Sequence, residues 1–211
     1  MHPNPAFRGA SRDENLGFVR DRGFGVLMVN GDPFPLCSHV PFLLGSDGKS
    51  AEMHLVRSNP ILGCLAGGGV AARLAVSGPD GYVSPDWYGV PDQVPTWNYV
   101  AVHLSGRLYA LPPDELSGHL DRLSRFFEAH LVPKAPWGMG KVTPEVLARM
   151  MRMIVPVRLD MERIEGTWKL SQNKQDEARL RAAQGVEDTG VAALAALMRS
   201  PPLGGNADAP D

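Results

Sequence analysis

Residues that could bind a phosphate group lie between positions 54 and 60. The segment His54-Leu55-Val56-Arg57-Ser58-Asn59-Pro60 leaves an apolar stretch and enters a helix start. At such a place the free backbone N–H groups and the helix dipole favour an anion. Arg57 adds a planar cation and Ser58 adds a hydroxyl group. The alternative is that Asn59 only caps the helix while Arg57 is solvated, so the segment alone leaves both interpretations open.

Two further segments could contact a flat or charged ligand. Trp97-Asn98-Tyr99 places an amide between two aromatic rings, which can stack on a planar ring or hydrogen-bond to its edge. The run from Lys169 to Asn173 reads Lys-Leu-Ser-Gln-Asn and supplies one cation and several uncharged donors. Each segment also has a purely structural interpretation. The aromatic cluster could belong to the core at a barrel end, and the polar run could cap a following helix.

Other kinds of catalytic site are not indicated by the spacing of residues. The sequence has no Gly-x-Ser-x-Gly, and Gly45-Ser46-Asp47-Gly48 is typical of a hairpin turn. It also has no His-Glu-x-x-His and no Cys-x-x-Cys. His39, His54 and His103 lie on three different predicted strands, where a barrel could still bring them together. We therefore predict no metal site and no serine nucleophile.

The elements that position these residues are short and separated by glycine and proline. The chain has 23 Gly and 19 Pro, which is typical of many strands and turns. Hydrophobic patterning predicts strands at 24–29, 36–44, 51–56, 70–77, 97–109 and 155–161, with a turn at 78–81. It predicts helices at 12–22, from 60, at 114–131 and 144–154, and weaker helix over 175–198 that is broken near Gly185 and Gly190. Clustered strands without regular helix alternation favour a mainly β (α+β) fold, an antiparallel β-barrel with peripheral helices.

Length and composition predict one globular domain. The chain has 211 residues, of which 44% are hydrophobic, and we expect a single domain over 1–185 followed by a weakly helical to disordered tail over 186–211. The net charge of −2 argues against a protein that mainly coats nucleic acid. Two cysteines imply no disulfide framework. No segment resembles a membrane span or a signal peptide, so we expect a cytoplasmic protein without membrane association.

Several sequence blocks, taken in order, resemble one family. The blocks are Ser38-His39-Val40-Pro41-Phe42, Arg57-Ser58-Asn59-Pro60, Gly78-Pro79, Tyr82-Val83-Ser84-Pro85, Trp87-Tyr88, Val94-Pro95-Thr96-Trp97-Asn98-Tyr99, Ala101-Val102-His103, Gly106 and Lys169-Leu170-Ser171-Gln172-Asn173. This pattern is similar to that of the PaiB-like, FMN-binding negative transcriptional regulators. The likeness runs from about Met1 to Asn173, and its Pro-Thr-Trp-Asn-Tyr and Lys-Leu-Ser-Gln-Asn blocks are long and specific.

The resemblance implies a split antiparallel β-barrel that forms a homodimer and holds FMN at the subunit interface. It implies that the flavin phosphate lies at the end of a central strand and the start of the next short helix. Carried onto this chain, the cofactor-binding residues would be Arg57, Ser58, Asn59 and His54 at the phosphate, Ser38 and His39 beside the flavin or its ribityl chain, Trp97 and Asn98 at the ring, and Lys169, Ser171 and Gln172 closing the site.

Three functions are compatible with this reading. The first is a flavoprotein that acts as a negative regulator of transcription, as the resemblance implies. The second is an FMN-dependent oxidoreductase of the same fold, in which the cofactor supplies the chemistry. The third is a barrel without cofactor that acts through protein contacts. Residues 158–181 hold six Lys/Arg and five Asp/Glu, a mixed surface, and no helix-turn-helix pattern is present. The sequence therefore gives no support for direct DNA binding.

Overall fold

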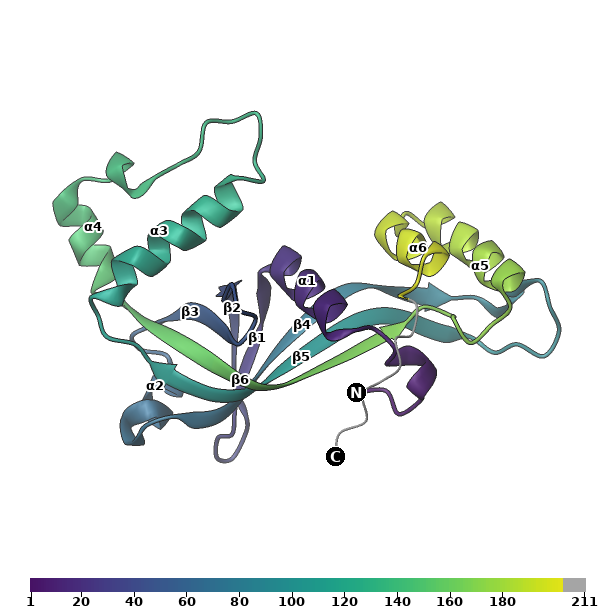
Figure 1. The fold of residues 1–211 in the computed structure, drawn as a ribbon, viewed down its shortest axis with the longest axis horizontal. Helices are drawn as coiled ribbons and strands as arrows, with labels where there is room; N and C mark the ends of the chain where they lie inside the picture. The colour runs from purple at the N-terminus through teal and green to yellow at the C-terminus, as the bar shows by residue number, and fades with distance from the viewer. Residues whose placement is uncertain (203–211) are drawn as a thin grey trace. The chain divides into compact units, whose positions relative to one another are not determined.

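The computed structural model describes residues 1–202 of the chain (Figure 1). The contacts between Cα atoms divide the chain into two compact units. Unit 1 comprises residues 1–22, 75–103 and the segment from 164 onward. Unit 2 comprises residues 23–74 and 104–163.

Six strands form a closed barrel in the order β1-β2-β3-β6-β5-β4. The strands are β1 Phe24–Val29, β2 Leu36–Leu44, β3 Ser50–Val56, β4 Val70–Val83, β5 Thr96–Ala110 and β6 Ile154–Lys169. β1 pairs with β2, β2 pairs with β3, and β3 pairs with β6, each in antiparallel orientation. The predicted split antiparallel barrel with peripheral helices is confirmed.

The register of unit 2 decides which side chains of β3 face the barrel interior. The two strands predicted at 24–29 and 36–44 pair as the antiparallel hairpin β1–β2, in which Phe24 pairs with Pro41. β3 then pairs with β6 from Ser50 opposite Asp160 to Val56 opposite Ile154. Ala51, Met53 and Leu55 are buried, and the alternation of a strand places Glu52 and His54 on the opposite, outer face.

Three helices belong to unit 2, namely α2 Pro60–Cys64, α3 Glu115–Glu128 and α4 Pro144–Met151. α3 is the predicted amphipathic helix, and it buries Leu116 and Leu123 together with His119. Figure 1 shows α3 above β3, to the outer face of which it brings His119. α4 begins after the N-cap residue Thr143, near the predicted position, but has no fully buried residue.

Three helices belong to unit 1, namely α1 Arg12–Arg22, α5 Asp176–Asp188 and α6 Ala192–Arg199. A capping box starts α1, because Glu14 N donates to Ser11 Oγ at 3.2 Å and Ser11 N donates to Glu14 Oε2 at 2.6 Å. α5 and α6 lie side by side (Figure 1) and close a core cluster on the strands. The buried members of this cluster are Val83, Tyr88, Val100, Trp168, Leu170, Ala178, Ala182, Ala183, Val186, Leu194, Ala195 and Met198.

Two local predictions are wrong because packing outweighs turn propensity. The predicted turn at 78–81 lies inside β4, where a Cβ at Gly78 would lie 2.8 Å from the Phe18 ring, so this glycine permits a close approach. The predicted break at Gly185 is absent, and α5 continues to Asp188. The expected domain boundary at 185/186 therefore falls within α5. Residues 203–211 of the expected tail lie outside the described residues.

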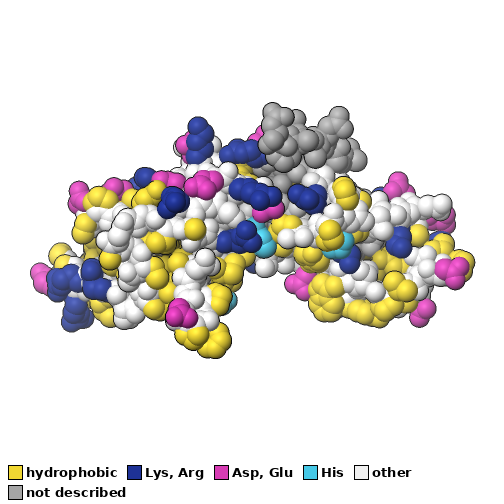
Figure 2. All heavy atoms as spheres, turned by 90° about the horizontal axis from the view of Figure 1, so that it is seen from below, with side chains coloured by type: hydrophobic (Ala, Val, Ile, Leu, Met, Phe, Trp, Pro, Cys, Tyr) yellow, Lys and Arg dark blue, Asp and Glu magenta, His cyan; other side chains and the backbone are white. Residues whose placement is uncertain are grey.

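Short 3₁₀ helices complete the described structure. They are η1 Pro5–Phe7, η2 Leu65–Gly67, η3 Pro85–Tyr88 and η4 Met139–Lys141. On the face drawn in Figure 2, Lys and Arg side chains are interspersed with Asp and Glu and with apolar side chains. This face therefore carries no single basic field of the kind that binds nucleic acid backbones.

Candidate functional site

The corner between β3 and α2 is held by the side chain of Asn59. Its Oδ1 accepts a hydrogen bond from Ile61 N at 3.0 Å, which caps α2 as predicted. Its Nδ2 donates to Ser38 Oγ at 3.1 Å. The second bond ties β2 to the corner, so the structure brings Ser38 and Asn59 together.

Arg57 is fixed at this corner by backbone carbonyl groups of the segment that joins α4 to β6. Its Nε donates to Arg152 O at 2.7 Å and its Nη2 donates to Ile154 O at 3.3 Å. Its backbone N donates to Met153 O at 2.7 Å. Within residues 1–202, Nη1 makes no hydrogen bond, and both Arg57 and Ser58 are exposed. The corner therefore presents an oriented cation that keeps donor capacity for an anion.

His39 lies apart from this corner. It is exposed on β2, and its ring stacks on Phe24 with the ring centroids 6.4 Å apart. Because successive side chains of a strand point to opposite faces, Ser38 and His39 cannot both face one ligand from regular strand geometry. Ser38 is the member of this predicted pair that reaches the corner.

His54 is directed to α3 on the outer face of β3. Its Nδ1 lies 3.3 Å from His119 Nε2, and His119 Nδ1 lies 3.7 Å from Glu52 Oε2. The same carboxylate oxygen accepts a hydrogen bond from Arg122 Nη2 at 2.5 Å. Burial lowers the pKa of His54, and burial followed by the nearby His54 lowers the pKa of His119 to about 4.

Sequence reasoning missed His119, Glu52 and Arg122. One signal was available, since His119 is a polar residue three positions after Leu116 and four before Leu123, within the apolar stripe of α3. Its partner on β3 is 65 residues away and cannot be read from local spacing.

In unit 1, the two most specific sequence blocks bind each other. Asn98 Nδ2 donates to Ser171 Oγ at 2.9 Å, and Tyr88 Oη lies 2.8 Å from the same oxygen. Lys169 Nζ donates to Thr96 Oγ1 at 2.5 Å. Asn98 and Ser171 are 0% and 3% exposed, so in this structure they offer almost no surface to a ligand. Their observed contacts are those of a buried network that joins β5 to the end of β6.

The remaining residues of the polar run close a turn. Gln172 Oε1 accepts from Leu170 N at 2.8 Å, and its Nε2 donates to Trp168 O. The run does not cap α5 through a side chain, because the N-cap residue is Gln175, whose side chain makes no capping hydrogen bond. Burial lowers the pKa of Lys169, whose Nζ lies 5.9 Å from the centre of the Phe7 ring.

Trp97 is the most open of the predicted residues in unit 1. Its side chain is 52% exposed, and its Nε1 donates to Asp80 Oδ1 at 2.9 Å. This bond holds the indole on the strands while leaving ring surface accessible. An exposed, oriented indole can stack on a flat ring.

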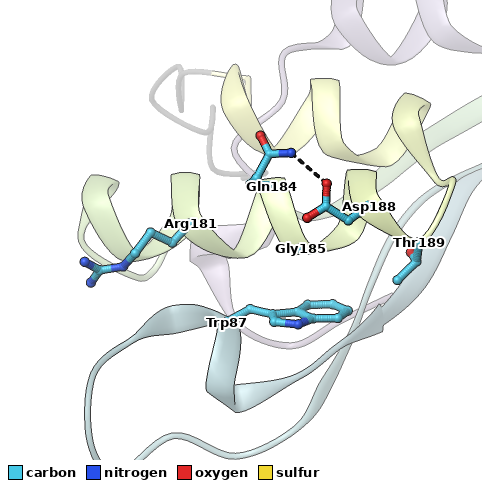
Figure 3. Close-up of a pocket in the computed structure, with 6 residues that line it drawn as sticks. All are labelled: Trp87, Arg181, Gln184, Gly185, Asp188 and Thr189. Atoms are coloured by element: carbon cyan, nitrogen blue, oxygen red, sulfur yellow. Dashed lines mark hydrogen bonds between the residues drawn. The ribbon is translucent and has the colours of Figure 1, made fainter.

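A shallow cavity of about 420 Å³ lies in unit 1 away from the predicted residues (Figure 3). Its lining consists of Trp87, Arg181, Gln184, Gly185, Asp188 and Thr189. Figure 3 shows the indole of Trp87 lying along α5 below Gly185. Polar groups of the lining bind one another or the backbone, as when Gln184 Nε2 donates to Asp188 Oδ1 at 2.9 Å and Arg181 Nε donates to Tyr88 O at 3.0 Å. We interpret this cavity as a result of the packing of α5 against Trp87, and not as a ligand site.

Residues 1–202 contain neither a cluster of metal-binding side chains nor a helix that could cross a membrane. No group of three or more His, Cys, Asp or Glu side chains in this part of the chain is placed to hold a metal ion. No helix within it has the length and apolar character needed to cross a bilayer.

Comparison with solved structures identifies proteins of the same fold. The chain superposes with a TM-score of 0.56 on the conserved hypothetical protein Rv2991 from Mycobacterium tuberculosis, at 14% identity over 81% of this chain and 92% of that one. It superposes with a TM-score of 0.55 on the FAD and heme binding protein from Mycobacterium smegmatis, at 16% identity over 77% and 73% of the two chains. At these identities the likeness concerns the fold alone.

Comparison with sequences identifies the family. The chain is 30% identical over 179 residues to "Protease synthase and sporulation protein PAI 2" of Bacillus subtilis, which covers 81% of each chain. Residues 1–163 match the family described as "Putative FMN-binding domain". With its split barrel, its strand-to-helix corner and these two matches, the chain belongs to the FMN-binding domain family that is related to PAI 2.

Proposed function

We propose that this protein binds FMN, that two copies form a homodimer, and that each flavin lies at the interface with its phosphate on the β3–α2 corner. The proposal depends on the geometry of Arg57. Backbone carbonyl groups hold its guanidinium in place, and the residue is exposed next to Ser58. A phosphate monoester suits this donor set, because guanidinium and hydroxyl donors make strong, charge-assisted bonds to it.

The corner residues have distinct roles in this proposal. Arg57 Nη1 and the Ser58 hydroxyl contact the phosphate. Asn59 and Ser38 hold the corner in shape through their mutual hydrogen bond. His54, three residues before Arg57 on the chain, is held by His119 and stays beside the phosphate rather than on it. His39 contacts the ribityl chain only if the partner approaches the outer face of β2.

In this proposal, residues of unit 1 of the second copy contact the flavin ring or support the residues that do. Trp97 offers exposed indole surface for stacking. Asn98 and Ser171 are buried, and Gln172 is used by the backbone, so we assign these three residues to support of the ring site. Lys169 supports the same segment through Thr96. When bound, FMN would supply electron or hydride transfer, and the protein would supply orientation.

We propose a regulatory role by analogy with PAI 2, whose name refers to protease synthase and sporulation. We propose that regulation acts through protein contacts or through the flavin. The charges of both signs on the surface in Figure 2 give no track for a DNA backbone.

Paired titrations with FMN and riboflavin test the phosphate assignment, because riboflavin has the same ring and ribityl chain but no phosphate. Quenching of flavin fluorescence on addition of protein gives both affinities. We expect FMN to bind at least tenfold more tightly than riboflavin, and light scattering during size-exclusion chromatography to give the mass of a dimer. Equal affinities would remove the phosphate from the corner, and absence of binding by either flavin would overturn the proposed function.

A further inference from the structure

The contact between His54 and His119 joins a barrel strand to the helix that covers it. His54 lies on the outer face of β3 and His119 on the buried face of α3, with Nδ1 and Nε2 3.3 Å apart. His119 is 1% exposed, so the contact is shielded from water on the side of the helix. Nearby, Arg122 of α3 binds Glu52 of β3 at 2.5 Å. These two polar contacts, together with buried Leu116 and Leu123, attach α3.

The chemistry of two facing imidazoles limits how many protons the pair can hold. One ring has to donate its N–H and the other has to accept with a lone pair. His119 Nδ1 faces the carboxylate of Glu52 at 3.7 Å, which favours a proton on that nitrogen. His119 Nε2 is then the acceptor and His54 Nδ1 the donor. A proton added to His54 Nε2 preserves this bond, whereas a proton added to His119 Nε2 sets two N–H groups against each other.

Other charges around the pair do not remove this limit. Glu52 on β3 and Arg122 on α3 act on His119 in opposite directions, since the carboxylate favours its protonation and the guanidinium opposes it. Arg158 on β6 is the cross-strand partner of Glu52 and binds Asp160, and Glu115 of α3 lies within its electrostatic reach. The carboxylate nearest to His119 is therefore shared between two arginines.

We propose that the His54–His119 pair is an acid-sensitive latch that holds α3 on the outer face of β3 and releases the helix when the second imidazole is protonated. The latch consists of side chains of β3 and α3, and its contact needs no bound flavin. While α3 is docked, the two imidazoles together take up at most one additional proton. When α3 is undocked, each imidazole can take up one, so acid favours undocking. Burial is the main reason why the pKa of His119 is lowered from its ordinary 6.5 to about 4. Between these two pH values the docked helix therefore keeps His119 neutral. The equilibrium constant for undocking of α3 then rises by up to tenfold for each pH unit of acidification, or about 300-fold between pH 6.5 and pH 4.

Amide hydrogen exchange between pH 7.5 and 4 tests the latch on the full chain. Protection of α3 amides, corrected for the pH dependence of the chemical exchange rate, should fall steeply below pH 6.5. Protection of α5, a helix without histidine in unit 1, serves as the internal control and should fall much less. Equal losses in the two helices that persist in the variant His119→Leu would overturn the proposal, because they would report global unfolding that does not depend on the pair.

Variants separate the imidazoles from the carboxylates. His119→Leu removes the titrating ring and keeps an apolar side chain at this position, so α3 protection should become nearly independent of pH. His130→Gln, at an exposed histidine just after α3, should behave like the wild type. If His119→Leu loses α3 protection over the same pH range as the wild type, Glu52 rather than the pair is the acid sensor and the proposal is wrong.

A measurement on the wild type keeps the test valid if the Leu variant does not fold. Long-range ¹H–¹⁵N spectra of the imidazole nitrogens report tautomer and protonation directly. We expect His54 to carry its proton on Nδ1 at pH 7.5 and to titrate before His119. The opposite order of titration, or a His119 that titrates near pH 6.5, would overturn the latch.

Discussion

Asn98 donates a hydrogen bond to Ser171 at 2.9 Å, and this bond connects two sequence blocks that are 73 residues apart. Tyr88 contacts the same hydroxyl at 2.8 Å, so one serine oxygen serves two buried partners. Ser171 also has a backbone φ of 63°, a conformation that favours glycine. The hydroxyl group therefore accounts for a serine at a position where the backbone alone would select glycine.

Replacement of Ser171 should separate the effect of its hydroxyl hydrogen bonds from the effect of its backbone conformation. Ser171→Ala leaves two buried polar groups without their partner and keeps the strained φ, so we expect a loss of about 1–3 kcal/mol in the free energy of unfolding. Ser171→Gly removes the same bonds but relieves the backbone, so it should cost less. Urea denaturation of both variants measures the difference. A glycine variant less stable than the alanine variant would show that backbone strain is negligible at this position.

Substitution of Arg57 should weaken FMN binding by the loss of a charge-assisted contact. We expect Arg57→Ala to lower the affinity about 10- to 100-fold, or about 1.5–3 kcal/mol, and to leave riboflavin affinity unchanged. Arg57→Lys keeps the charge but not the planar fork that binds the carbonyl groups, so it should restore only part of the affinity.

Arg152→Ala is the matched control for this series, because Arg152 contributes its carbonyl group to the site and that group survives the substitution. Its FMN affinity should stay within about twofold of the wild type. An equal loss in Arg152→Ala and Arg57→Ala would indicate a general effect of positive charge instead of a phosphate contact.

Gly185 should not tolerate a side chain. A Cβ there would lie 2.5 Å from the Trp87 ring, so we expect Gly185→Ala to destabilise the protein by about 1–3 kcal/mol despite the higher helix propensity of alanine. Gly17→Ala on α1 is the control, since no atom lies within 4 Å of its added Cβ. This variant should be neutral or stabilised. Thermal unfolding of both, with Trp87→Ala as background, checks whether the cost arises from the indole.

Stability of the whole chain should fall with acid because of His119. A histidine whose folded pKa is lowered is neutral in the fold and charged in the unfolded chain, so its contribution is complete above about pH 6.5 and is lost as the pH falls to about 4. This difference corresponds to about 3 kcal/mol. Urea unfolding at steps between pH 7.5 and 4 should show that the free energy of unfolding falls in the wild type and in His130→Gln. The fall should be smaller in His119→Leu. Identical curves for all three proteins would contradict the assignment.

Local signals in the sequence sufficed for much of the fold, including the strand-to-helix corner at Asn59. The helix at 12–22 and the helix that starts at Pro60 were predicted correctly, because the start of a helix depends on residues within a few positions. The turn expected at Gly78 was wrong, because packing against Phe18 and Val100 decides the conformation there.

Long-range contacts account for what the sequence could not predict. Partners of His119 and Ser171 lie 65 and 73 residues away, and their pairing depends on the barrel register and on the docking of α3. Predicted ligand residues such as Asn98 are buried, and a single sequence does not distinguish a buried amide from an exposed one. The sequence shows the residue types directly, whereas the burial of Asn98 and Ser171 depends on the packing of the whole unit.

The family match ends at residue 163, in the middle of β6, which runs from Ile154 to Lys169. A gene truncated at that point would encode a strand without its second half. Nine of the twelve buried residues in the core cluster of unit 1 come after residue 163. The product should aggregate on expression, so the shortest useful version of this protein for crystallisation or screening extends through α6 to at least Arg199.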